Sequence, residues 1–150
     1  MYRVLVGLLL IAGIGAGIWW MARPQLPDPP QIEALGSMDP DVAALLRELR
    51  SAIEDDRSSA AAWGRFAMGC EANGFVGAAR DAYQRATLLA PDEPRWAYRL
   101  ALVTSRLGDN DAALATLARV NELAPEYGPA WFRRGLWLLD RADVAGAEQA

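Results

Sequence analysis

Three arginines recur at a fixed spacing in this 150-residue sequence and have the chemistry to recognise carboxylates. Arg65, Arg99 and Arg133 are each 34 residues apart. The planar guanidinium of arginine can donate two hydrogen bonds to one carboxylate. Apolar residues stand directly before these arginines or three residues after them: Tyr98, Phe132, Met68, Leu102 and Leu136. The pattern predicts a surface that binds a segment carrying acidic and apolar residues, with simple solvation of the arginines as the alternative.

Most catalytic sites need residue types that this sequence lacks. It has no histidine, its 15 basic residues are all arginine, and Cys70 is its only cysteine. Nucleophilic triads, zinc sites and histidine acid–base catalysis are therefore excluded. The acidic residues at 54–56 and 109–111 lie at predicted helix ends, where they cap the helix or face solvent. We expect a protein that is not an enzyme, without cofactor or metal, in which Cys70 is a buried packing residue.

The first residues of the chain are far more apolar than the rest. Residues 4–22 contain no charged side chain, and these 19 residues match the thickness of a membrane core. Trp19 and Trp20 stand at the end of the run, as in the aromatic belt of a membrane helix. A cleaved signal peptide is the alternative, with Gly15 and Gly17 as its small residues. The run continues past these glycines, so we predict a transmembrane signal-anchor helix over residues 1–23.

Residues within and around the predicted anchor give weaker indications of helix packing and of membrane orientation. Gly13 and Gly17 have the spacing at which small residues let membrane helices pack closely, although glycine is common in membrane helices. Arg3 and Arg23 flank the run, and we favour an N-terminus in the cytoplasm. The chain would then be a single-pass protein of a bacterial inner membrane, with its C-terminal domain in the periplasm. Residues 24–39 are rich in proline and are expected to form a linker.

The chain beyond residue 39 has the periodicity of helices. Asp39 and Pro40 are typical of a helix start, and they begin an amphipathic lead-in helix predicted over residues 40–57. A repeat then follows, since the tripeptide Leu-Ala-Pro at 89–91 returns at 123–125. Ala79, Ala113 and Ala147 are also 34 residues apart, and Trp63 and Trp131 are separated by two such periods.

A 34-residue period with two helices per unit resembles the tetratricopeptide repeat (TPR) family. The resemblance extends over repeats at about 60–93, 94–127 and an incomplete 128–150. The matching residues are Trp63, Phe66, Ala67, Cys70, Ala79, Tyr83, Ala86 and Pro91 in the first repeat, Ala97, Leu100, Ala101, Thr104, Ala113, Leu117, Val120 and Pro125 in the second, and Trp131, Gly135, Leu138 and Ala147 in the third. It implies an all-α fold, with a TPR-type α-solenoid of helix-turn-helix repeats over residues 58–150.

In this family the first helices of successive repeats line a concave groove that binds peptides. The resemblance places the following residues in that groove: Arg65, Met68, Arg95, Tyr98, Arg99, Leu102, Phe132, Arg133 and Leu136. Arg95 and Arg99 loosely resemble the later basic pair of the carboxylate clamp in chaperone-binding relatives. Gly64 and Met68 replace the first lysine–asparagine pair of that clamp.

These features together predict a membrane-anchored scaffold that binds a protein or peptide partner next to the membrane. Relatives with this layout assist envelope tasks, including cytochrome c maturation, and the helix at 40–57 is loosely similar to that group. The alternative is a structural accessory subunit or homo-oligomer, held by the Gly13/Gly17 face and the exposed repeat end. The net charge of −4 argues against a nucleic-acid partner. The last predicted helix is so short that we expect the chain to continue beyond Ala150, or a partner helix to cover it.

Overall fold

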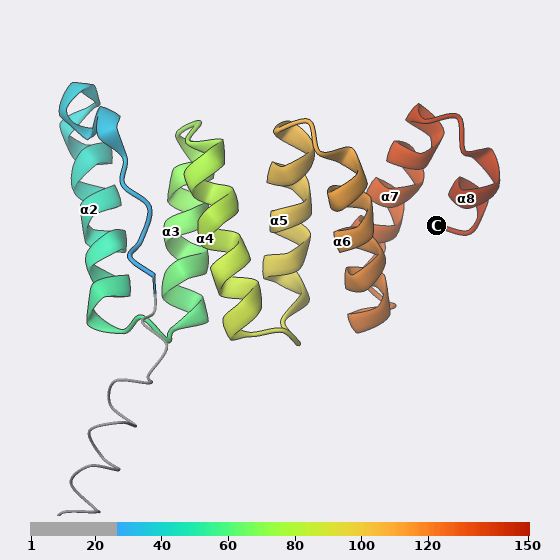
Figure 1. The fold of residues 1–150 in the computed structure, drawn as a ribbon, viewed down its shortest axis with the longest axis horizontal. Coiled ribbons are helices and arrows are strands. Elements are labelled where there is room, and N and C mark those ends of the chain that lie inside the picture. The colour runs from blue at the N-terminus through green and yellow to red at the C-terminus, as the bar shows by residue number, and fades with distance from the viewer. Residues whose placement is uncertain (1–26) are drawn as a thin grey trace, which may run out of the picture.

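The computed structural model describes residues 27–150, and this part of the chain is a row of antiparallel α-helices (Figure 1). The elements are η1 (Glu33–Ser37, a 3-10 helix), α2 (Pro40–Asp55), α3 (Ala60–Ala72), α4 (Val76–Leu89), α5 (Pro94–Arg106), α6 (Asn110–Leu123), α7 (Gly128–Asp140) and α8 (Val144–Glu148). Within residues 27–150, none of the helices has the length and apolar character needed to span a membrane. The predicted anchor at 4–22, including Gly13 and Gly17, lies outside the described residues.

The turns inside the helix pairs repeat with the sequence period. Gly74, Gly108 and Ala142 occupy equivalent positions 34 residues apart, and each has a positive φ, of 81°, 91° and 60°. The amide that follows each of them donates back to a carbonyl five residues earlier, at 2.9, 3.2 and 2.9 Å, as in a Schellman motif. Glycine adopts this left-handed conformation without steric cost, whereas Ala142 adopts it despite its Cβ. The same left-handed turn therefore joins the two helices of each pair at all three positions.

Two tryptophans fix the entries to the first and third helix pairs in the same way. The indole Nε1 of Trp63 donates to the carbonyl oxygen of Arg57 at 2.9 Å. The indole Nε1 of Trp131 donates to the carbonyl oxygen of Pro125 at 2.8 Å. Each acceptor precedes its tryptophan by six residues, so the side chain closes the loop that leads into its helix.

Small residues lie where paired helices meet. Ala67, Ala79, Ala101 and Ala113 are fully buried, and Tyr83 and Leu117 fill the space between neighbouring pairs. Gly64 lies directly against the second pair, because a Cβ there would overlap the ring of Trp96. The Trp96 ring also stacks on Tyr83, with 6.4 Å between ring centroids. Glycine at position 64 thus lets α5 pack against α3.

The lead-in helix α2 has the register of a second helix in a repeat. Residues 42–55 precede the α4 residues 76–89 by one 34-residue period. The matching first helix would fall on the residues before 39, where Pro27, Pro29 and Pro30 disfavour an α-helix. These residues form an extended segment followed by η1. We refer to residues 27–38 as the strap.

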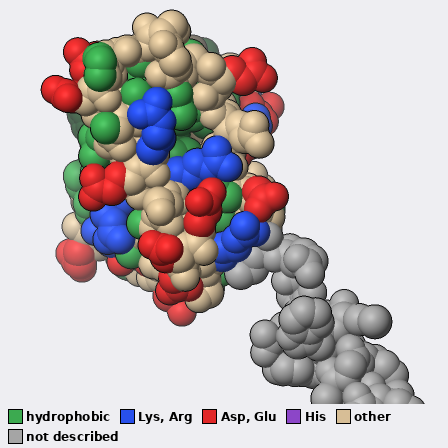
Figure 2. Space-filling model, turned by 90° about the vertical axis from the view of Figure 1, so that its left-hand side faces the viewer, with side chains coloured by type: hydrophobic (Ala, Val, Ile, Leu, Met, Phe, Trp, Pro, Cys, Tyr) green, Lys and Arg blue, Asp and Glu red, His purple; other side chains and the backbone are tan. Residues whose placement is uncertain are grey.

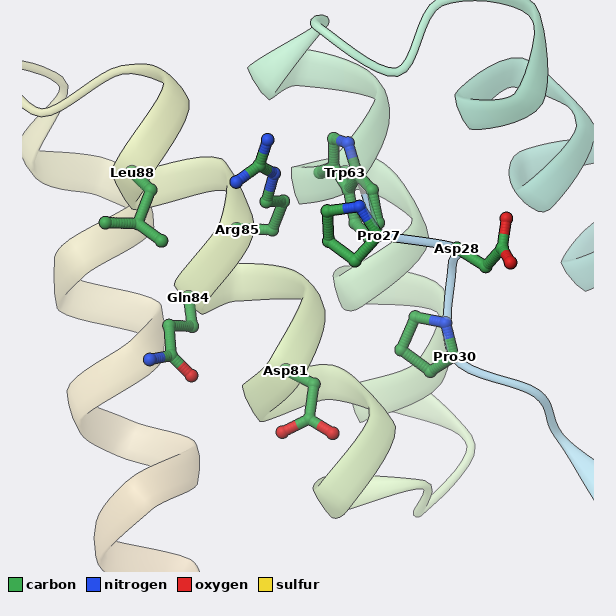
Figure 3. Close-up of a pocket in the computed structure, with 8 residues that line it drawn as sticks. All are labelled: Pro27, Asp28, Pro30, Trp63, Asp81, Gln84, Arg85 and Leu88. Carbon is green, nitrogen blue, oxygen red and sulfur yellow. The ribbon is translucent and has the colours of Figure 1, made fainter. Parts of the chain in front are cut away.

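The strap packs against the helices, although the sequence predicted a linker there. Pro29 is buried, while Ile32, Leu35 and Met38 contact the core formed by α2, α3 and α4. Asp28 forms an ion pair with Arg57 at 2.8 Å. Figure 3 shows Pro27 and Pro30 beside Trp63, opposite Arg85 and Leu88 of α4, where they border a hollow of about 370 Å³.

The two ends of the row have different surfaces. At the α2 end, positive and negative side chains alternate over the surface (Figure 2), and exposed residues of α2 include Arg47, Glu48 and Glu54. At the other end, Leu139 and Val144 are more than half exposed, and Ala130 is the only buried residue of α7. A stack of helix pairs needs a polar face on its outermost helix, and α2 provides one.

The assigned register can be tested by overpacking one helix contact. We expect Ala79→Leu or Ala113→Leu to lower the free energy of unfolding by about 1–3 kcal/mol, because each site is closed on all sides. The exposed Arg65 provides the control, since Arg65→Ala should change the stability by about 0.5 kcal/mol or less. Thermal unfolding measures both effects. Equal melting temperatures for the three variants would contradict the register.

Candidate functional site: the face of the first helices

The arginines of the 34-residue pattern lie on the first helices of the three pairs, but in different surroundings. Arg65 on α3 is exposed. Arg99 on α5 forms an ion pair with Glu71 of α3, at 3.3 Å between Nη1 and Oε2. Arg133 on α7 is partly buried, and its Nε has no protein acceptor among the described residues. Equal spacing in the sequence therefore produces one solvated, one paired and one unpartnered arginine.

Glu71 ties three helices together at this face. Its Oε2 accepts a hydrogen bond from the hydroxyl of Tyr83 on α4 at 2.7 Å, as well as the contact from Arg99. Its Oε1 lies 3.9 Å from Nη1 of Arg106 on α5. Only 16% of the Glu71 side chain is exposed. Burial raises the pKa of Tyr83, and the adjacent carboxylate of Glu71 raises it further, so the hydroxyl remains a donor.

A hollow of about 300 Å³ opens between α3, α5 and α7. It is lined by Glu71, Leu102, Ser105, Arg106, Arg133 and Trp137, and we refer to it as the α3–α5–α7 hollow. A second hollow, lined by Ser105, Asn110, Trp137, Asp140 and Arg141, shares two of these residues. Trp137 therefore separates two adjoining hollows along α7.

Two of the predicted groove residues have local partners instead. Arg95 lies over the ring of Trp96, with its Cζ 4.2 Å from the ring centroid, and its guanidinium is 3.6 Å from Glu93. Tyr98 packs edge-on against Tyr127, with ring centroids 5.2 Å apart. Both contacts lie near the start of α5, so these side chains stabilise the loops before α5 and α7.

Three other predicted residues are apolar and exposed. Met68 on α3 and Leu136 on α7 are about two-fifths exposed, and Phe132 on α7 is 67% exposed. Phe132 and Leu136 lie one helical turn apart on α7, whose other face packs against α6. Of the nine predicted groove residues, Leu102 and Arg133 line the α3–α5–α7 hollow, and Arg99 contacts its wall through Glu71.

The sequence prediction missed Glu71, Ser105, Arg106 and Trp137. Glu71 follows Met68 by three residues, Ser105 and Arg106 follow Leu102 by three and four, and Trp137 follows Arg133 by four. These are the spacings that place side chains one above the other on a helix. Continuing the predicted pattern by one further helical turn would have found all four.

Cys70 is enclosed beneath this face and is not part of it. Its side chain is fully buried in the core between α3 and its neighbours. Burial raises the pKa of the Cys70 thiol to about 12, so the thiol stays protonated at neutral pH. This environment is the one expected for a packing residue.

The chain has structural neighbours but no match by sequence. No family model matches it, and no curated protein does. Two solved structures of MamA, a TPR-containing protein, share the arrangement. The first has a TM-score of 0.68 at 23% identity, with 72% of this chain and 63% of MamA covered. The second has a TM-score of 0.66 at 23% identity, with 77% and 62% covered.

The fold is a TPR-like helical repeat. This confirms the all-helical repeat architecture expected from the 34-residue period. The chain spans less than two-thirds of the length of the MamA chains that it matches. At 23% identity the likeness establishes the fold alone.

Removing the hydroxyl of Tyr83 tests the importance of the Glu71 network. We expect Tyr83→Phe to lower the free energy of unfolding by about 1.5–3 kcal/mol, because a buried bond to a carboxylate is lost. Tyr98→Phe is the matched control, since the Tyr98 hydroxyl makes no hydrogen bond with other described residues, and about 0.5 kcal/mol or less is expected. Urea unfolding distinguishes the two. Indistinguishable stabilities would show that the Tyr83–Glu71 bond contributes nothing to stability.

Proposed function

We propose that this protein is a scaffold that binds a protein or peptide partner along the face formed by α3, α5 and α7. The observation that carries the proposal is the α3–α5–α7 hollow, where apolar and charged side chains from three first helices converge. The exposed Phe132 and Leu136 extend this surface along α7. Aromatic anchors and arginines are the residue types that contribute most at protein interfaces. The proposed role needs no catalysis.

Exposed apolar and charged groups are proposed to act together. An exposed ion pair contributes only about 0–1 kcal/mol, so arginines alone would bind a partner weakly. Burial of a large side chain such as that of Phe132 adds about 1.5–3 kcal/mol. A segment that satisfies both requirements carries acidic and apolar residues side by side. Binding should weaken with salt, because its ionic part is screened over about 8–10 Å.

We further propose that residues 4–22 anchor the protein in a bacterial inner membrane, with the helical domain in the periplasm. The uncharged run and the Trp19-Trp20 pair support the anchor. Assistance in envelope protein or cytochrome c biogenesis is the proposed setting, supported by the family resemblance of the lead-in helix and first repeat. Crosslinking and pull-down from membranes would identify the partner.

A homo-oligomer is the second candidate function. It is favoured by the exposed Leu139 and Val144 at the α7–α8 end of the row. Sedimentation of the full chain separates the two functions. Partner binding along the first helices needs no self-association, whereas the alternative requires a defined oligomer.

The binding face is tested by two substitutions at equally exposed apolar residues. Phe132 on α7 is 67% exposed, and Leu88 on the second helix α4 is 66% exposed. We expect Phe132→Ala to reduce capture of the crosslinked partner by about tenfold or more, as for a buried interface aromatic. Leu88→Ala should leave capture unchanged, because α4 lies outside the proposed face. Equal capture by both variants would refute this location.

The proposed anchor predicts that the N-terminal residues are retained in the mature protein. Intact-mass measurement and N-terminal sequencing of the membrane fraction should give the full chain starting at Met1 or Tyr2. Retention is expected because the apolar run continues without a break to Arg23. A mature protein that starts near Ile18 would instead identify a cleaved signal peptide.

A further inference from the structure

Arg133 is the arginine of the 34-residue pattern that is placed to receive a ligand carboxylate. The charge of Arg99 is already compensated by Glu71 at 3.3 Å. Arg65 is exposed and does not line the α3–α5–α7 hollow. Arg133 lines it and forms no ion pair or hydrogen bond with another described side chain. Its positive charge is therefore uncompensated and would attract a carboxylate that enters the hollow.

A second arginine faces the same space. Arg106 lines the hollow, and its nearest carboxylate oxygen, Oε1 of Glu71, is 3.9 Å away. That distance is an ion-pair contact but too long for a hydrogen bond, so the donors of Arg106 are not engaged by Glu71. Leu102 and Trp137 form the apolar part of the lining. Apolar walls exclude water and strengthen a charged hydrogen bond.

We infer that the α3–α5–α7 hollow holds one carboxylate of the partner segment, an aspartate or glutamate side chain, between Arg106 and Arg133. The apolar residue next to that carboxylate lies against Phe132 and Leu136 on the adjacent strip of α7. This inference rests on the proposed function and names the chemistry that the face recognises. Of the three arginines of the 34-residue pattern, Arg133 alone makes this ionic contact. Arg106, which is outside that pattern, supplies the second positive charge.

Tryptophan indoles report directly on this site. The full chain, isotope-labelled at tryptophan, is titrated with the acetylated and amidated tripeptide Leu-Glu-Leu and with the isosteric Leu-Gln-Leu. The indole signal of Trp137 should shift with the glutamate peptide and not with the glutamine peptide. The indole of Trp131, on the same helix but bound to Pro125, should stay in place.

Substitutions assign the response to individual arginines. Arg133→Gln and Arg106→Gln should each lower the affinity for the glutamate peptide by about tenfold, as expected for the loss of a charged hydrogen bond. Arg65→Gln is the control, because Arg65 has the same register two periods earlier and is outside the hollow. Equal shifts with both peptides, no shift of Trp137, or an unchanged affinity in Arg133→Gln would each overturn the inference. Capture of a partner that depends on Phe132 remains possible after any of these three results, so this inference and the proposed function can fail separately.

Discussion

The close packing of Trp96 over Gly64 is the contact on which the proposed binding face depends. Because Gly64 has no side chain, the indole of α5 can lie directly against the backbone of α3. That approach brings Arg99 and Arg106 to the Glu71 carboxylate, and Tyr83 reaches the same group from α4. A side chain at position 64 would overlap the Trp96 ring, so the ring or helix α5 would have to move. A movement of α5 would also displace Arg99 and Arg106 from Glu71.

The repeat architecture was predictable because its determinants are local and periodic. The turn glycines, the small residues at helix contacts and the loop-closing tryptophans recur at the 34-residue spacing. The repeat can therefore be recognised from the sequence. The state of each arginine was not predictable in this way. Whether Arg99 is paired depends on Glu71, which is 28 residues away and belongs to another helix. Periodicity identifies equivalent positions, but tertiary contacts make Arg65, Arg99 and Arg133 chemically different.

The strap shows how a repeat can lose one helix and still cover its neighbour. Prolines prevent the residues before Met38 from forming the first helix that their register would assign. Ile32, Leu35 and Met38 nevertheless contact the core that such a helix would have covered. The strap thus buries apolar side chains as a helix would, but it lacks the backbone hydrogen bonds of an α-helix. The proline-rich sequence predicted a linker, and it did not reveal that these residues pack against the helices.

Docking of the strap also limits how far the domain could lie from the proposed membrane anchor. If residues 4–22 are that anchor, only residues 23–26 separate it from Pro27, the first residue of the strap. The five Cα–Cα steps from Ala22 to Pro27 span at most about 18 Å. A domain on so short a tether would sample a thin layer above the bilayer. Membrane-bound partners would meet it at a high effective concentration, whereas partners that diffuse freely would gain nothing from the tether.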